Sequence, residues 1–224
     1  MSRALVVCAH PDDVDFGAAG TVAGWTSAGV EVTYCIATSG EAGETPGPVR
    51  EAEQRAAAAE VGVSDVVFLG YPDGRLTPSL ELRRDIAAVI RRVRPDRVLT
   101  WSPEINWDHI VTTHPDHRAV GEAAFAAIYP DARNPHAHPE LLAEGLEPWV
   151  VGELWLADGP ARLRNRAVDI TAHFARKLAA LRAHVTQTGG NPELAAQLRA
   201  HFSEVAKRHG IDGQAEEFQV VDTR

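Results

Sequence analysis

The chain has 224 residues, of which 45% are hydrophobic and 24% charged, the composition of an ordinary globular protein. Its 22 basic and 31 acidic residues give a net charge of −9, which argues against nucleic acid or an anionic membrane as main partner, because both need a clustered positive surface. The first residues lack the pattern of a signal peptide, and no apolar run reaches the about 18 residues of a membrane span. We therefore expect a soluble, cytoplasmic protein.

Segments with the character of strands and of helices alternate along most of the chain. Short apolar runs, typical of strands covered on both faces, predict strands at 4–9, 31–38, 65–70, 96–101 and 150–157. Helical spacing of apolar residues and strong helix formers predict helices at 14–28, 49–62, 79–94, 117–129, 170–187 and 192–210. This order predicts an α/β fold with a Rossmann-like, mostly parallel sheet and helices on both faces, as a single domain over 1–224.

One long stretch, residues 130–149, interrupts this alternation. It is rich in proline and histidine and has no clear period. A stretch of this length without regular structure inside a compact domain is usually functional or mobile. We expect it to lie on the substrate side of the sheet and to influence substrate choice, with the helices of about 170–210 completing the domain.

The polar residues that could carry chemistry follow the expected strands. The sequence HPDD (10–13) follows the first strand, TSGEAGE (38–44) the second and YPDGR (71–75) the third, while HPDH (114–117) comes after the fourth. Ligands of open parallel sheets bind outside the carboxyl ends of the strands. The sequence therefore predicts that these loops meet at one edge of the sheet.

The turn at 10–13 is unsuited to a dinucleotide, because it lacks a glycine-rich pattern and its two carboxylates would repel a pyrophosphate. Nicotinamide and flavin cofactors are therefore not expected. Imidazole and carboxylate groups suit a divalent metal instead. A capped loop explains the HPDD turn by itself, and surface polarity explains HPDH by itself. Their expected position at one edge of the sheet favours a metal site.

Five motifs in a fixed order carry a family resemblance: AHPDD, TSGEAG, the helix beginning REAE, PDGRL and HPDHRAVG. From about residue 4 to 187 the chain resembles the LmbE-like (PIG-L) zinc-dependent N-deacetylases. These include enzymes that remove N-acetyl from glucosaminyl groups in mycothiol, bacillithiol and glycolipid anchor synthesis. The resemblance implies a hydrolase that acts on a small N-acetylated amino sugar or related metabolite with Zn²⁺ or Fe²⁺, and it allows a homo-oligomer. It does not indicate which member of that substrate class is used.

The resemblance also implies roles for the HPDD turn. His10, Asp13 and His117 would be the metal ligands, and Asp12 would be the general base that takes a proton from water. The chemistry of these roles is consistent, because three protein ligands leave a coordination position open for water. A neighbouring carboxylate can then accept a proton from that water.

The remaining candidates follow from the later motifs. The resemblance implies that His114 is the general acid and that Asp116 orients it. Arg50 opens a helix expected to face the site and could bind a sugar hydroxyl or a phosphate, although a solvated charge explains it equally well. Asp73 could bind a sugar hydroxyl, although Asp-Gly is first of all a turn signal.

Two other functions are compatible with the same residues. A non-haem Fe(II) oxygenase could use His10, Asp12 and a distant histidine as its two-histidine, one-carboxylate triad, although such enzymes usually have β-rich scaffolds. A non-catalytic, metal-stabilised binding protein is the third hypothesis. Retention of Asp12 beside a complete ligand set argues against it, because a purely structural site would close its fourth position.

Overall fold

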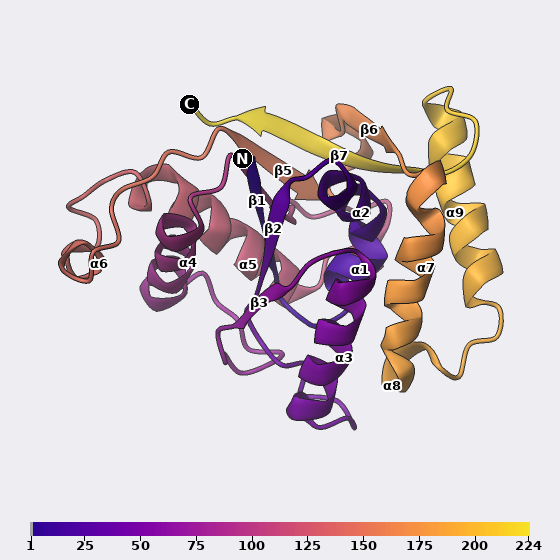
Figure 1. Cartoon of the computed structure of the whole chain (residues 1–224), viewed down its shortest axis with the longest axis horizontal. Helices are drawn as coiled ribbons and strands as arrows, with labels where there is room; N and C mark the ends of the chain where they lie inside the picture. The colour runs from indigo at the N-terminus through magenta and orange to yellow at the C-terminus, as the bar shows by residue number, and fades with distance from the viewer. Residues whose placement is uncertain (1) are drawn as a thin grey trace.

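The computed structural model describes residues 2–224 and contains one seven-stranded sheet in the order β3-β2-β1-β4-β5-β7-β6 (Figure 1). The strands are β1 (Arg3–Cys8), β2 (Glu31–Ile36), β3 (Asp65–Phe68), β4 (Arg97–Trp101), β5 (Glu153–Ala157), β6 (Arg166–Asp169) and β7 (Ala215–Asp222). The first five strands pair in parallel, and β7 pairs antiparallel with both β5 and β6. The expected mixed α/β fold with a mostly parallel sheet is confirmed.

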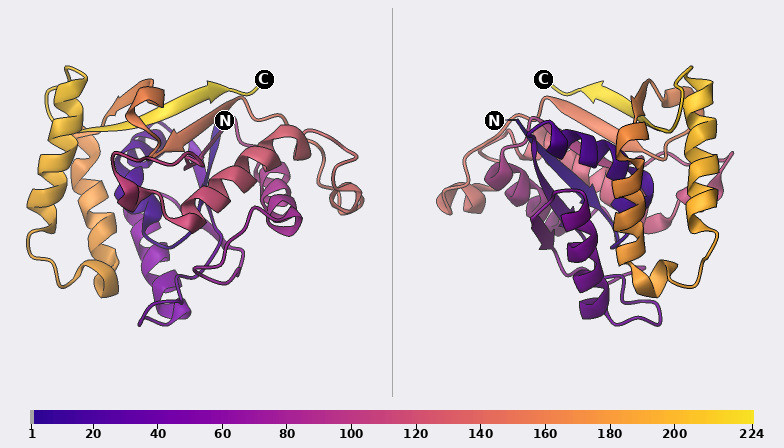
Figure 2. Two further views of the ribbon diagram at one scale, coloured as in Figure 1. Left: turned by 180° about the vertical axis from the view of Figure 1, so that it is seen from behind. Right: turned by 45° about the vertical axis from the view of Figure 1, so that its right-hand side comes forward.

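Helices cover both faces of this sheet (Figures 1 and 2). They are α1 (Asp13–Gly17), α2 (Ala19–Ser27), α3 (Gly47–Glu60), α4 (Leu80–Val93), α5 (Pro115–Ala126), α6 (Pro139–Ala143), α7 (Phe174–Ala183), α8 (Val185–Thr188) and α9 (Leu194–Arg208). One apolar cluster joins the sheet to α4 and α5, and a second joins its other face to α1, α2, α3 and α7. A third cluster packs α9 against α7. Among residues 2–224, no helix combines the length and the apolar character that crossing a bilayer requires.

Helix α4 illustrates how local sequence produces these layers. The Ser79 hydroxyl caps its first turn by accepting a hydrogen bond from the Leu82 amide. Leu82, Ile86 and Ile90 recur on one face and are fully buried. The helix ends at Arg94, whose φ of 55° turns the chain towards β4.

The prediction of a continuous helix over 14–28 is wrong, because the helix is interrupted at Ala18, between α1 and α2. The buried Lys177 ammonium donates to the carbonyl oxygens of Asp15 and Phe16, and also to the Glu216 carboxylate. Glu216 in turn accepts from the first amides of α2. Side chains distant in sequence thus satisfy the free backbone groups of both short helices, so the break is stable.

Two strands, β6 and β7, were not expected from the sequence. β7 carries charged residues such as Glu216 and Glu217 beside apolar ones, so its pattern resembles neither a buried strand nor a clean alternation. It pairs with β5 on one side and with β6 on the other, and these strands lie about 50 to 70 residues earlier in the chain. Only the assembled sheet provides that position.

The stretch 130–149 lies at the opposite edge of the sheet from the one expected. Helix α5 returns the chain from the carboxyl edge to the amino edge, and the stretch follows it. The Trp149 indole donates to the Pro95 carbonyl, just before β4, and packs against the guanidinium groups of Arg3 and Arg94. The expectation that this stretch lies on the substrate side is therefore wrong.

Candidate active site

The HPDD turn directs its two carboxylates to different places. The Asp13 Oδ2 atom accepts hydrogen bonds from the amides of Ala9 (3.1 Å) and His10 (2.8 Å), which folds the turn back on the end of β1. Asp12 adopts φ 84°, a left-handed conformation that aspartate tolerates better than most residues. Asp13 is consequently buried beneath the turn, whereas Asp12 lines a cleft above it.

Three histidines line this cleft, and two of them contact the buried Asp13. α5 begins at Pro115, which places His114 at its cap and His117 in its first turn. The candidate ligand atoms of His10, His114 and His117 all lie within 4.8 Å of one another. Asp13 Oδ1 lies 2.9 Å from His117 Nε2, and Asp13 Oδ2 lies 3.5 Å from His10 Nδ1. Imidazole nitrogens and a carboxylate oxygen at these separations are a suitable donor set for Zn²⁺ or Fe²⁺.

The electrostatics of the cluster favour a bound cation. Burial alone would raise the pKa of Asp13, but His117 and His10 outweigh it and hold that pKa well below its usual range. Burial likewise opposes charge on His10, yet its hydrogen bond and charge interaction with Asp13 raise its pKa to about 9. The pKa of His117 is raised by the same carboxylate. The site therefore attracts positive charge, which a divalent metal can supply in place of protons.

The pKa of Asp12 shifts in the opposite direction from that of Asp13, and the pKa of His114 in the opposite direction from that of His117. Burial, followed by the negative charge of Asp13, raises the pKa of Asp12 to about 7. Burial and the positive charges of His10 and His117 lower the pKa of His114. A carboxylate that titrates near neutral pH has the proton affinity expected of a general base.

Asp116 does not orient His114 through its carboxylate, contrary to the sequence-based expectation. Its Oδ2 atom accepts from the Gly74 amide (2.8 Å) and lies 3.3 Å from His10 Nε2, and its Oδ1 atom accepts from the Leu76 amide. Only the Asp116 backbone amide reaches His114, at Nδ1. The side chain of Asp116 points under the cleft, where it ties His10 to the loop after β3.

Arg50 and Asp73 both line the cleft, which has a volume of about 360 Å³. The Arg50 guanidinium donates to the carbonyl oxygens of Gly40 and Pro11 and to the Asp12 carboxylate at 3.0 Å. Asp73 accepts from a backbone amide through Oδ2, and its Oδ1 lies 3.0 Å from His10 Nε2. Both side chains therefore hold other site residues in place, and their contact with substrate stays a prediction.

A buried network behind Asp12 was not identified from the sequence. Gln54 Oε1 accepts from the Asp12 amide, and Gln54 Nε2 donates to Asp15 Oδ2, both at 2.8 Å. His184 Nε2 lies 2.8 Å from the same Asp15 oxygen. All three side chains are fully buried. The sequence feature that could have indicated this network is the four-residue spacing of Arg50 and Gln54, which places both on the face of α3 next to the HPDD segment.

Comparisons with known proteins agree with this geometry. A family model described as PIG-L, GlcNAc-PI de-N-acetylase, matches residues 5–128. The chain belongs to the PIG-L family. It is 34% identical over 199 residues to a probable N-acetyl-alpha-D-glucosaminyl L-malate deacetylase 2 of Bacillus cereus, a match covering 82% of this chain and 83% of the relative. It is 32% identical to a diacetylchitobiose deacetylase of Thermococcus kodakarensis, over 84% of this chain and 70% of that protein.

Solved structures show the same fold over the full length of this PIG-L member. The N,N'-diacetylchitobiose deacetylase of Pyrococcus horikoshii superposes with a TM-score of 0.89 at 27% identity, covering 99% of this chain and 84% of the other. A Thermus thermophilus protein superposes with a TM-score of 0.81 at 29% identity, covering 100% of this chain and 96% of that one. The family resemblance carried by the five motifs is confirmed.

Proposed function

We propose that this protein is a metal-dependent hydrolase that removes an N-acetyl group from an amino sugar or a related small metabolite. Relatives at 30% identity or more are named as deacetylases of N-acetylglucosaminyl malate, of diacetylchitobiose and of an inositol-linked acetamido sugar. The observation that carries the proposal is the position of Asp12, with its pKa near 7, in the same cleft as two histidines that contact the buried Asp13.

The metal, Zn²⁺ or Fe²⁺, would be held by His10, Asp13 and His117. When bound, it would supply two effects: a lowered pKa of water at its open position, and polarisation of the acetyl carbonyl. The Asp116 and Asp73 carboxylates, at 3.3 and 3.0 Å from His10 Nε2, would keep that ring in one orientation.

Asp12 would take a proton from the attacking water. Its pKa near 7 leaves a large ionised fraction at neutral pH, and its contact with the buried Arg50 keeps the carboxylate at the cleft wall. Oxygen from water forms the new bond to the acetyl carbon, the carbon–nitrogen bond breaks, and acetate and an amine result. The leaving nitrogen needs a proton, which His114 can donate from the same cleft after acquiring it during the reaction.

Of the two alternatives, the iron oxygenase loses support because the relatives named above are hydrolases in the same family. The non-catalytic binding protein is disfavoured by Asp12, since a raised pKa beside a candidate metal site costs stability and gives a purely structural site no benefit. A homo-oligomer and a cytoplasmic location stay predictions.

The direct test is acetate release by the protein loaded with Zn²⁺ or with Fe²⁺. N-Acetylglucosamine, diacetylchitobiose and N-acetylglucosaminyl malate would be offered in parallel, with oxygen consumption recorded in the same samples. Release of acetate without oxygen uptake, lost in Asp12→Asn, is the expected result. Oxygen consumption coupled to substrate, with no acetate formed by either metal form, would overturn the proposal.

A further inference from the structure

None of the roles proposed above uses the buried pair of His184 and Asp15. His184 lies at the junction of α7 and α8, and its Nε2 atom is 2.8 Å from Asp15 Oδ2. Within residues 2–224, Gln54 provides the only other side-chain hydrogen bond to the Asp15 carboxylate, whose Oδ1 atom has no partner. A buried carboxylate depends on its few donors, so His184 is one of two side chains that keep the Asp15 carboxylate in place.

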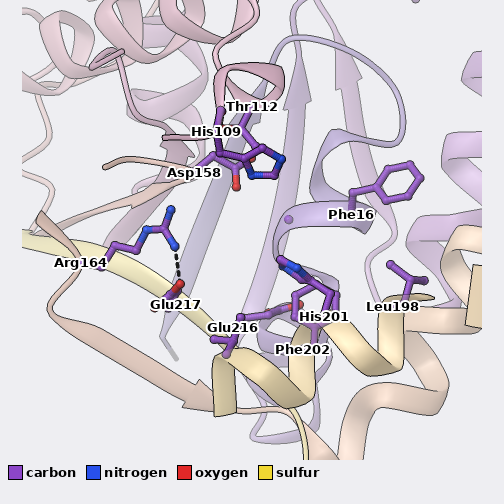
Figure 3. Close-up of a pocket in the computed structure, with 12 residues that line it drawn as sticks. Phe16, His109, Thr112, Asp158, Arg164, Leu198, His201, Phe202, Glu216 and Glu217 are labelled. Atoms are coloured by element: carbon purple, nitrogen blue, oxygen red, sulfur yellow. Dashed lines mark hydrogen bonds and ion pairs between the residues drawn. The ribbon is translucent and has the colours of Figure 1, made fainter. Parts of the chain in front are cut away.

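Helix α1 has little apolar packing to hold it. It has five residues, and Val14 is its one fully buried apolar side chain. Phe16 is 40% exposed and lies at the edge of a cavity of about 250 Å³ between α1, α9 and β7 (Figure 3). Lys177 binds the carbonyl oxygens at the end of the helix. The polar contacts of the Asp15 side chain are therefore needed to fix the remainder of α1.

Two routes link Asp15 to Asp12. The Asp12 carbonyl oxygen accepts hydrogen bonds from the amides of Asp15 (2.9 Å) and Phe16 (3.0 Å) at the start of α1. The Gln54 side chain joins the same two residues, since its Nε2 donates to Asp15 Oδ2 and its Oε1 accepts from the Asp12 amide. An amide group is planar, so movement of the Asp15 oxygen turns the whole Gln54 amide and alters its contact with Asp12.

We propose that His184 is a positioning residue for Asp12, and that it acts through Asp15 and Gln54 without contacting substrate or metal. The inference rests on the proposed function, in which Asp12 is the general base. The contact requires a hydrogen-bond donor at the position of His184 Nε2, because the other ring nitrogen, Nδ1, is buried and has no partner within residues 2–224.

The candidate metal ligand Asp13 lies on the same helix but has separate contacts. Its carboxylate accepts from the amides of Ala9 and His10 and lies 2.9 Å from His117 Nε2. These contacts remain when His184 is replaced. The positioning role should therefore appear in turnover and not in metal content.

Two replacements of His184 form a matched pair. A glutamine side chain places its amide nitrogen near the position of histidine Nε2, whereas the shorter asparagine side chain reaches only as far as Nδ1. His184→Gln should therefore keep a donor to Asp15, and His184→Asn should lose it. Thr188→Val is the control for damage to the α7–α8 junction, because the buried Thr188 hydroxyl donates to the carbonyl oxygens of Leu181 and His184 and not to Asp15.

We expect His184→Asn, loaded with Zn²⁺, to show a kcat about tenfold below that of the wild type, the lower end of the range for residues that orient metal-site groups. Its KM and metal content should be nearly unchanged. His184→Gln and Thr188→Val should keep most of the wild-type kcat when all variants are assayed well below their melting temperatures. Equal losses in His184→Asn and His184→Gln, or an equal loss in Thr188→Val, would overturn the proposal.

Hydrogen exchange of the Asp12 amide tests the same link without turnover. In the Zn²⁺-loaded protein, we expect His184→Asn to speed this exchange at least about fivefold, whereas His184→Gln and Thr188→Val should leave it near the wild-type rate. Asp15→Asn, which removes the charge that strengthens the same hydrogen bonds, is a second variant and should also speed exchange. These results would support the positioning role even if none of the sugars is deacetylated. Wild-type exchange at Asp12 in either folded variant would overturn it.

Discussion

Gln54 should control the position of Asp12 without contacting substrate or metal. Gln54→Leu keeps the approximate shape of the side chain but removes the acceptor for the Asp12 amide and a donor to Asp15. Loss of the acceptor leaves the partly buried Asp12 amide unpaired, which costs about 1–3 kcal/mol of stability. Loss of the donor removes one hydrogen bond from the Asp15 carboxylate, which keeps its contact with His184. We expect the free energy of unfolding to fall by about 3 kcal/mol.

The effect on catalysis should be separable from this loss of stability. Asp12 is held in a left-handed conformation whose backbone amide is bound by Gln54, so without that contact only Arg50 fixes the carboxylate, and its alignment with the water it deprotonates is weakened. We expect kcat to fall about 10–100-fold, the scale seen for residues that orient metal-site groups, with KM and metal content nearly unchanged. Gln197→Leu, on the exposed side of α9, is the control. A destabilised Gln54→Leu enzyme with wild-type kcat at 25 °C would refute the positioning role, and so would loss of the metal.

Three further predictions concern the paired acids, the histidine ligand and the buried ion pair. Asp12→Asn should retain the metal while kcat falls about 10²–10⁴-fold. Asp13→Asn and His117→Ala should instead lose activity because they lose the metal. Full metal occupancy of His117→Ala by elemental analysis would show that His117 is not a ligand. In metal-free protein, ionisation of Asp12 should cost stability increasingly as pH rises from its unfolded pKa of 3.8 through its folded pKa of about 7. Thermal melts should therefore show Asp12→Asn more stable than wild type at pH 8 and equal to it at pH 4, and equal melting at both would contradict the raised pKa. Lys177→Met leaves Glu216 buried without its ammonium partner, so urea unfolding should reveal a loss of about 3–5 kcal/mol, and an unchanged midpoint would show the pair to be dispensable.

The order of the five parallel strands, and the edge of the sheet at which the reactive residues meet, were predictable from the sequence. Periodicity identified the five parallel strands, and the connectivity of a parallel sheet places every strand-to-helix loop at the same edge. The HPDD turn and the HPDH segment therefore had to lie near each other, although about 100 residues separate them. Their motifs also identified the family.

The partners of individual side chains were decided only by the tertiary structure. The carboxylate of Asp116 contacts His10 instead of His114, because its direction depends on how the first turn of α5 packs over the loop after β3. Gln54, likewise, meets Asp12 only because α3 packs beside the turn. Local periodicity determines which face of an element is buried, but it does not determine which polar groups on two buried faces meet.

The position of the stretch 130–149, and the existence of a cavity between α1, α9 and β7, were also decided only by the tertiary structure. The stretch lies at the amino edge because α5 spans the depth of the sheet before it begins, a matter of helix length and direction that its own composition does not encode. The cavity is enclosed by α1, β7 and α9, and β7 occupies its place only after β5 has provided a pairing edge. Residues such as Phe16 and Asp158 are 142 positions apart in the chain and share this cavity because the sheet brings their elements together.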